Sequence, residues 1–202
     1  MSFLESPITL VLLAANILLS VMAFNDDAFM KKNLFIVGPI LRGKEYYRLI
    51  SSGFLHLNLM HLFINMYVLF QIGSGLERFM GSPRYAALYA ASLIGGSVWS
   101  LMENKKNLLY SALGASGATS GLIMAYCFVV PTAWFTFPPL PAWVLAIAFF
   151  GITAWLARKP NQRIGHDAHM GGMLAGGAMI LLFYPFLWNR FINAIEQAIG
   201  LA

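Results

Sequence analysis

Long stretches without a charged side chain constrain the fold of this chain most. The longest charge-free run extends from Asn107 to Ala157, and shorter ones cover 6–25, 49–76, 85–102 and 168–189. A transmembrane helix needs about 20 consecutive, mostly apolar residues. Only 10% of the residues are charged and 59% are hydrophobic, whereas soluble domains carry about 25% charged residues. The chain is therefore predicted to be an integral membrane protein in a lipid bilayer.

The longest run must be divided, because it is too long for one span. Its middle, PTAWFTFPPLPAW, holds four prolines, which break helices, together with Trp and Phe, which favour the membrane interface. Division there gives six spans, at about residues 7–24, 54–73, 85–102, 114–130, 141–157 and 168–188. The predicted fold class is an all-α polytopic membrane protein, with one membrane domain over 1–202 and no separate soluble domain.

Two further segments flank these spans. The connection over 26–53 contains too many aromatic residues for a disordered linker, so we expect it to pack on or into the membrane surface. The tail from Arg190 places its apolar residues near one helical face, which favours a short interfacial helix.

Polar residues inside the apolar blocks indicate a functional site, because polar groups in a membrane usually face a cavity or a partner. His61 and Asn65 are four residues apart and share one helix face. His56 lies about 140° around from His61 on an ideal helix, so we place it at the start of the second span. Ser116 and His169 lie on the fourth and sixth spans. All these residues are near the N-terminal ends of even-numbered spans, so they lie on one side of the membrane.

Paired small residues predict that the fourth and sixth spans touch. Gly117 and Gly121 match Gly172 and Gly176 in spacing, and such pairs let membrane helices approach closely. This contact would bring Ser116 within reach of His169.

Glycines around the serine also favour an irregular backbone there. Gly114 and Gly117 flank Ser116, and irregular backbone at membrane depth is tolerated only in a protein interior or along a wet cavity. We therefore expect a water-accessible cavity, open on one side, with Ser116 near its floor.

This set of residues is sufficient for peptide hydrolysis. A neutral His can activate a Ser nucleophile, and the Ser116 N–H, His61 and Asn65 can donate to the oxyanion. Asp167, two residues from His169, would point to another helix face, so we predict a Ser-His dyad.

Three other functions were weighed against it. His56, His61 and His169 could bind Zn²⁺, although no H-E-x-x-H pair is present. A channel or a non-catalytic binder could also use a polar cavity, and a cleavage assay separates these from an enzyme. Nucleic-acid binding is disfavoured because the net charge of +5 lacks a basic cluster with interleaved aromatics.

The motifs resemble those of the rhomboid family of intramembrane serine proteases. GASG, with Gly114 and Gly117, is similar to the family's G-x-S-G and implies Ser116 as nucleophile. AHMGGMLAG implies His169 as base, with Gly172 and Gly176 at the contact with the fourth span.

Two further motifs extend the resemblance. HLNLMHLFIN implies His61 and Asn65 as oxyanion donors and His56 as a support. EYYR, from Glu45 to Arg48, resembles E-x-W-R with Tyr47 in place of Trp.

The resemblance implies a six-helix bundle with a short central fourth helix, in a bacterial inner membrane. It implies cleavage of single-pass membrane proteins and no metal or cofactor. The alternative is a catalytically silent member that binds transmembrane clients. One departure is Ser120, where some bacterial members place a Tyr on the catalytic His, so His169 must be oriented otherwise.

The second departure concerns orientation. Ten of the 13 Lys and Arg residues lie in the odd-numbered loops, and the others are Arg78, Arg84 and Arg190. The positive-inside rule would therefore place the active-site mouth in the cytoplasm. The resemblance implies the outer side, and we follow it because the charges of the first loop can be used in folding contacts. The sequence makes no prediction of the oligomeric state.

Overall fold

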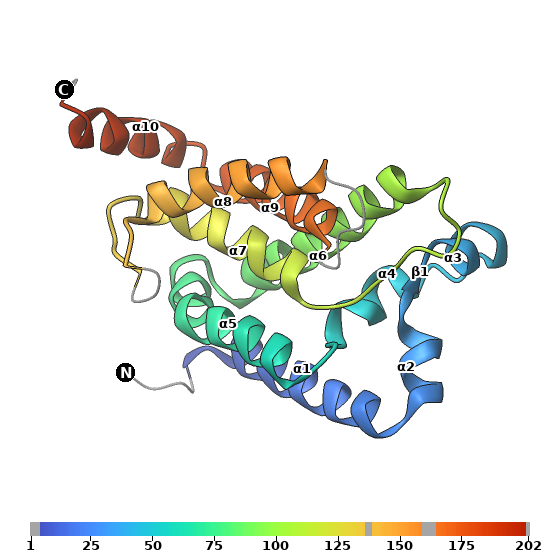
Figure 1. Ribbon diagram of the computed structural model, residues 1–202. Coiled ribbons are helices and arrows are strands. Elements are labelled where there is room, and N and C mark those ends of the chain that lie inside the picture. The colour runs from blue at the N-terminus through green and yellow to red at the C-terminus, as the bar shows by residue number, and fades with distance from the viewer. Residues whose placement is uncertain (1–4, 136–138, 159–164, 201–202) are drawn as a thin grey trace.

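The computed structural model describes residues 5–135, 139–158 and 165–200 and is predominantly helical (Figure 1). Two short strands, β1 (Phe35–Ile36) and β2 (Ser111–Ala112), pair antiparallel, with Phe35 opposite Ala112. The helices are α1 (Pro7–Asn25), α2 (Asp27–Asn33), α3 (Val37–Gly43), α4 (Arg48–Ser51), the 3₁₀ turn η2 (Ser52–Phe54), α5 (Leu59–Met80), α6 (Ser82–Asn104), α7 (Ser116–Val129), α8 (Ala142–Ala157), α9 (His166–Phe183) and α10 (Leu187–Ala198).

The helices have the lengths and apolar composition of a membrane protein. In the described parts of the chain, α1, α5 and α6 are each long and apolar enough to cross a membrane. The pair α9 and α10 meets the same criterion only together, whereas α7 and α8 are shorter apolar helices. With 14 residues, α7 is about 21 Å long, less than the roughly 30 Å of a bilayer core. The predicted all-α membrane class is confirmed, and the count of six spans stays a prediction.

Three helix boundaries differ from those predicted by five residues or more, and one of them is the end of α5, which lies at Met80 rather than at residue 73. The second span was expected from residue 54, but α5 begins at Leu59, because the Asn58 side chain caps the helix by accepting from His61 N at 2.8 Å. The sixth was expected to reach residue 188, but α9 ends at Phe183, and α10 turns away by 112°. Pro185 accounts for that break, since it has no N–H and disfavours helical backbone at Tyr184.

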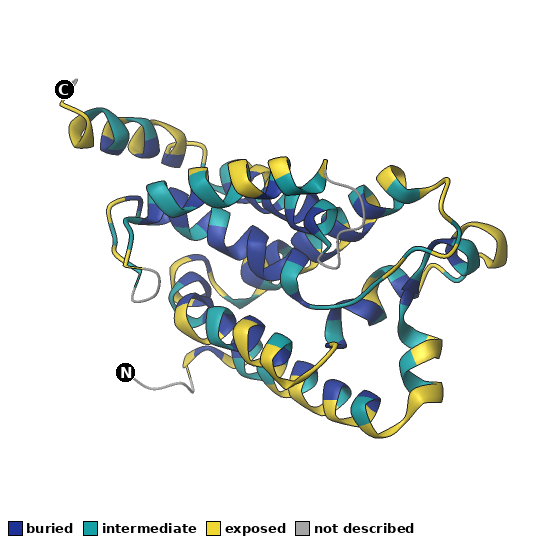
Figure 2. Ribbon diagram, in the orientation of Figure 1, coloured by how far each residue is buried: buried dark blue, intermediate teal, exposed yellow. Residues whose placement is uncertain are grey.

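Helix α7 lies at the centre of the bundle. It packs against α6 and α9, with α5 and α8 also beside it (Figure 1). Nearly all of its residues after Ser116 are buried, as the dark blue ribbon of Figure 2 shows. Near the C-terminal end of α5, Glu77 accepts hydrogen bonds from the backbone N–H groups of Ile8 and Thr9, which joins α5 to the start of α1.

The connection over 26–53 is folded rather than loose. Arg48 is 7% exposed, and its guanidinium pairs with Glu45 at 2.6 Å and donates to the carbonyl of Leu34 at 2.7 Å. Tyr47 donates its hydroxyl to the carbonyl of Lys32 at 2.9 Å. Through β1 and β2, this connection is tied to the segment immediately before Ser116.

Candidate active site

Ser116 is the first residue of α7 and is half-buried. Gly114, two residues earlier, has φ of +126°, a conformation that residues with a Cβ rarely adopt. Its N–H donates to the carbonyl of Ser52 at 3.0 Å. The irregular backbone predicted at Gly114 is therefore present, whereas Gly117 lies within the regular helix. At the helix start the Ser116 N–H has no intrahelical partner, so it is free to bind an anion.

The side chains of His61 and Ser116 both lie close to Gly114. A Cβ added at Gly114 would lie 2.6 Å from His61 Cε1 and 3.7 Å from Ser116 Oγ. The Leu57 N–H donates to His61 Nδ1 at 3.4 Å, so we assign the ring hydrogen to Nε2. This tautomer gives His61 a donor on the ring edge that faces Gly114.

Asn65 follows His61 by one turn of α5 and is buried. Its Oδ1 accepts from Thr119 Oγ1 of α7 at 3.1 Å, and its Nδ2 donates to the His61 carbonyl at 2.9 Å. A primary amide has two N–H donors, so one remains for a ligand.

His56 is fully buried in the segment between η2 and α5, and it contacts the backbone next to the serine. Its Nε2 accepts from the Ala115 N–H at 3.4 Å, and its Nδ1 lies 2.8 Å from Ser20 Oγ. Ser20 in turn donates to the Phe54 carbonyl at 3.1 Å. This chain of bonds assigns the ring hydrogen to Nδ1. Sequence reasoning missed Ser20, whose one signal was a hydroxyl inside an apolar span.

The predicted approach of the fourth and sixth spans is present as the contact between α7 and α9. A Cβ at Gly172 would overlap the Gly117 carbonyl oxygen, and one at Gly117 would lie 3.3 Å from the Ala168 oxygen. Gly176 meets Gly121 in the same way. Ser116 and His169 are therefore chain neighbours of two backbone segments in contact. No hydrogen bond joins their side chains within the described ranges.

The His169 ring is surrounded by other rings that sequence reasoning did not identify. Phe149 of α8 lies 5.8 Å away between ring centroids, and His166 lies 5.7 Å away, edge to face. The Asp167 carboxylate instead accepts from Asn104 Nδ2 of α6 at 2.9 Å. The carboxylate of Asp167 is thus engaged by α6, and the Ser-His dyad stays a prediction.

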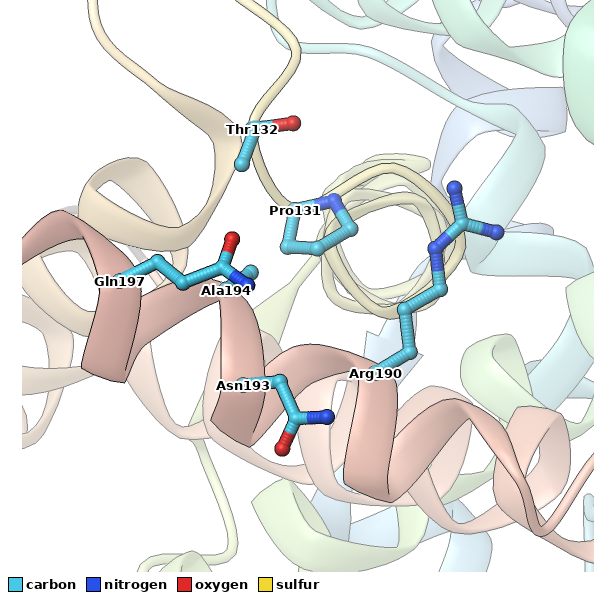
Figure 3. Close-up of a pocket in the computed structure, with 6 residues that line it drawn as sticks. All are labelled: Pro131, Thr132, Arg190, Asn193, Ala194 and Gln197. Atoms are coloured by element: carbon cyan, nitrogen blue, oxygen red, sulfur yellow. The ribbon is translucent and has the colours of Figure 1, made fainter. Parts of the chain in front are cut away.

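A separate pocket of about 460 Å³ lies at the opposite end of α7 from Ser116. Pro131 and Thr132 line it just beyond the C-terminal end of α7, whereas Ser116 begins that helix. In Figure 3, Arg190 and Gln197 of α10 lie on either side of Pro131. This pocket is not part of the candidate site, and the wet cavity expected above Ser116 stays a prediction.

The histidines do not form a metal-ligand set. In the part of the chain that the structure describes, no three His, Cys, Asp or Glu side chains gather where they could hold a metal ion. The zinc alternative therefore has no set of ligands among these residues.

The fold and motifs are those of a polytopic membrane protein with a candidate site of Ser, His and Asn residues. Comparison with known proteins identifies its family. The Rhomboid domain matches residues 43–186, so the chain belongs to the rhomboid family. It is 32% identical over 160 residues to RHOMBOID-like protein 6, mitochondrial, of Arabidopsis thaliana, covering 78% of this chain and 51% of that protein. It is 36% identical over 138 residues to Rhomboid protein 1, mitochondrial, of Saccharomyces cerevisiae, and this match covers 63% of this chain and 39% of that protein.

A third relative is RHOMBOID-like protein 5 of Arabidopsis thaliana, 36% identical over 141 residues, with 68% of this chain and 45% of that protein covered. The chain thus spans about half the length, or less, of these relatives. Two of the three are named mitochondrial, so the comparisons give no support to the predicted bacterial inner membrane or bacterial type. Membership of the family and the helical composition establish an integral membrane protein.

Proposed function

We propose that this chain is an intramembrane serine endopeptidase that uses a dyad of Ser116 and His169. The observation that supports it most is that the His61 ring and the Ser116 hydroxyl both lie close to Gly114. There the free N–H at the start of α7 adds a further donor. The close contact of α7 and α9 carries His169 to the same region.

The reaction would be an acyl transfer in two halves. Ser116 Oγ attacks the carbonyl carbon of the scissile peptide while its proton passes to His169. The oxyanion binds the Ser116 N–H, His61 Nε2–H and the second Asn65 amide hydrogen. Collapse expels the amine, which takes the proton from His169, and water then hydrolyses the acyl-enzyme by the reverse proton transfers.

The proposed substrates are single-pass transmembrane proteins that reach the site from the bilayer. We propose that the six spans form one membrane domain and that the site opens on the face opposite the termini. His56 would hold Ala115 in place, and Glu45 and Arg48 would hold the connection that is paired to β2. No cofactor enters this mechanism.

Cleavage of a reporter protein with one transmembrane helix, by purified chain in detergent or liposomes, tests the proposal. Ser116→Ala removes one hydroxyl and keeps a small residue, so it should fold like the parent and cleave nothing. Equal cleavage by a folded, pure Ser116→Ala variant would show that Ser116 is not the nucleophile. An uncleaved reporter that co-purifies with both proteins would instead indicate the silent, client-binding alternative.

A further inference from the structure

The imidazole of His169 has to be held in one orientation if it is to act as a base. In many serine hydrolases a hydrogen bond to the second ring nitrogen does this. Here His169 Nδ1 is buried and has no hydrogen-bond partner among the described residues. The nearest carboxylate in the sequence, Asp167, is bonded to Asn104. Hydrogen bonding therefore does not account for the orientation of the ring.

Packing against two other rings does account for it. Phe149 reaches the ring from α8, with 5.8 Å between centroids and 43° between planes. His166 reaches it from one turn earlier on α9, with 5.7 Å between centroids and 86° between planes. A ring near-perpendicular to His166 and tilted on Phe149 is restricted in its rotation about the Cβ–Cγ bond, because aromatic pairs favour such geometries.

The residues of α7 do not offer the same contact. Ser120, one turn after Ser116, is 2% exposed and carries only a hydroxyl. It has no ring to place against an imidazole. Apart from His166 of α9 itself, the ring that packs on His169 thus comes from α8, a helix that carries none of the residues proposed for the chemistry.

We propose that Phe149 is a positioning residue for His169, and that Phe149 and His166 together set the orientation in which the imidazole faces Ser116. This inference rests on the proposed function, because it assigns His169 the role of base. Phe149 touches no reacting atom in this scheme and acts only through the ring of His169. Since Phe149 belongs to α8, the packing of α8 on α9 then determines how the base is presented.

The first test is steady-state cleavage by Phe149→Leu, Phe149→Tyr and Phe150→Leu. The matched control, Phe150→Leu, makes the same change about 100° further around the helix. For Phe149→Leu we expect kcat to fall about 10- to 100-fold with little change in KM, since a misplaced catalytic group costs on that order. Phe149→Tyr keeps a ring and should stay within roughly threefold of the parent. A purely structural role would lower the unfolding temperature without this split between kcat and KM.

The second test measures the ring contact without needing activity. In protein labelled with ¹³C-histidine, the His169 ring signal is assigned by its loss in His169→Gln. A neighbouring aromatic ring shifts it, so Phe149→Leu should move this signal, and Phe150→Leu should leave it in place. The spectra of Phe149→Leu and Phe150→Leu can also be recorded in the Ser116→Ala background, where no cleavage occurs.

The outcomes distinguish this proposal from the proposed function. An unmoved His169 signal in Phe149→Leu, or a kcat equal to that of Phe150→Leu, overturns the positioning role. If Phe149→Leu does not fold, a kcat for Phe149→Tyr as low as the background of Ser116→Ala overturns it as well. A parent as inactive as Ser116→Ala refutes the protease and with it the base that Phe149 would position. The signal shift would still report whether the rings touch.

Discussion

The surroundings of His61 and His169 differ in ways that separate their proposed roles. His61 accepts a backbone hydrogen bond at Nδ1 and keeps Nε2 on the side of Gly114. That arrangement suits a fixed donor to an oxyanion. His169 is buried, its Nδ1 has no hydrogen-bond partner among the described residues, and the preceding residue, Ala168, contacts Gly117 of α7. Because no backbone N–H of these residues donates to Nδ1, that nitrogen can carry the ring hydrogen, which leaves Nε2 unprotonated to act as the base.

Removal of the two histidines should therefore have unequal effects. In His169→Ala, Ser116 is an unactivated alcohol, so turnover should fall to near background. His61→Ala loses one of several donors, which typically costs about 10²–10³-fold in kcat. Its KM should change little, because the interaction forms mainly in the transition state. Initial rates of reporter cleavage over a range of substrate concentrations give both constants.

Two reagents serve as controls for this comparison. A serine-directed phosphonate should label Ser116 in the parent and scarcely in His169→Ala, and a chelator should leave cleavage unchanged. Complete and equal loss in both variants, with inhibition by chelator and no labelling, would refute the dyad and favour a metal mechanism.

The ion pair of Glu45 and Arg48 gives a pH-dependent prediction outside the spans. The hydrogen bond from Arg48, followed by that from Tyr47, lowers the pKa of the Glu45 carboxyl below its ordinary 4.5. A lowered folded-state pKa stabilises the fold above the unfolded pKa, and this contribution is lost as the pH falls through the folded value. At neutral pH the parent should therefore have a higher unfolding temperature than Glu45→Gln. This gap in unfolding temperature should close below about pH 4.5.

Thermal unfolding in detergent between pH 3 and 7 measures that gap. The Glu5→Gln variant is a suitable control, because it makes the same change at a carboxylate that has no ion pair with any of the described residues. A gap between parent and Glu45→Gln that persists unchanged at low pH would contradict the assignment of the ion pair.

At the scale of elements, the packing of α7 on α9 brings the site together, and glycines make it possible. A Cβ at Gly172 would overlap the backbone oxygen of Gly117, whereas one at Gly75 on α5 would meet nothing within 4 Å. Gly172→Ala should therefore separate the helices, destabilise the protein by about 1–3 kcal/mol and lower cleavage. Gly75→Ala should be neutral or stabilising, by up to about 1 kcal/mol from helix propensity.

Unfolding temperature and cleavage rate, measured in parallel on both alanine variants, check this prediction. Their substitutions are chemically identical and both lie within helices, so propensity cannot explain a difference in sign. If Gly172→Ala melts and cleaves like Gly75→Ala, the close contact of α7 and α9 is wrong.

Apolar runs were sufficient to predict most helices, because burial in lipid requires uninterrupted apolar sequence. The predicted first span, 7–24, differs from α1 by one residue. The start of α5 was not predicted, because it depends on a hydrogen bond that one capping side chain, Asn58, accepts. Composition alone does not show whether an Asn makes such a bond. The turn from α9 to α10 follows Pro185, a signal that was present and not used.

The site residues could be predicted where chemistry requires an unusual residue in lipid, as for Ser116 and His61. Their supports could not, because an ordinary apolar or small residue provides them. Phe149 reads as one more membrane-facing aromatic, and only the packing of α8 on α9 shows that it contacts His169. Ser20 reads as a packing residue, and only the fold places it beside His56. The roles assigned to all these residues stay predictions.

At the scale of the whole molecule, the distribution of charge and the resemblance to the rhomboid family imply opposite orientations. Arg48 is buried among the carbonyls of the first connection and paired with Glu45. A cation held by such contacts contributes to folding, so under the positive-inside rule it is weaker evidence that its loop is cytoplasmic. Without Arg48, nine basic residues in the odd-numbered loops still stand against three elsewhere, so the orientation stays a prediction.

Cysteine labelling in a bacterial host, in a Cys127→Ala background, tests the orientation directly. Arg158→Cys lies at the end of α8, in the connection to α9, and Arg78→Cys lies near the end of α5. With six spans these positions face opposite sides, so each serves as the control for the other. An impermeant maleimide on intact spheroplasts should label Arg158→Cys, and Arg78→Cys should react only after lysis. The reverse pattern would favour the charge count, and reaction of both positions before lysis would contradict the six-span topology itself.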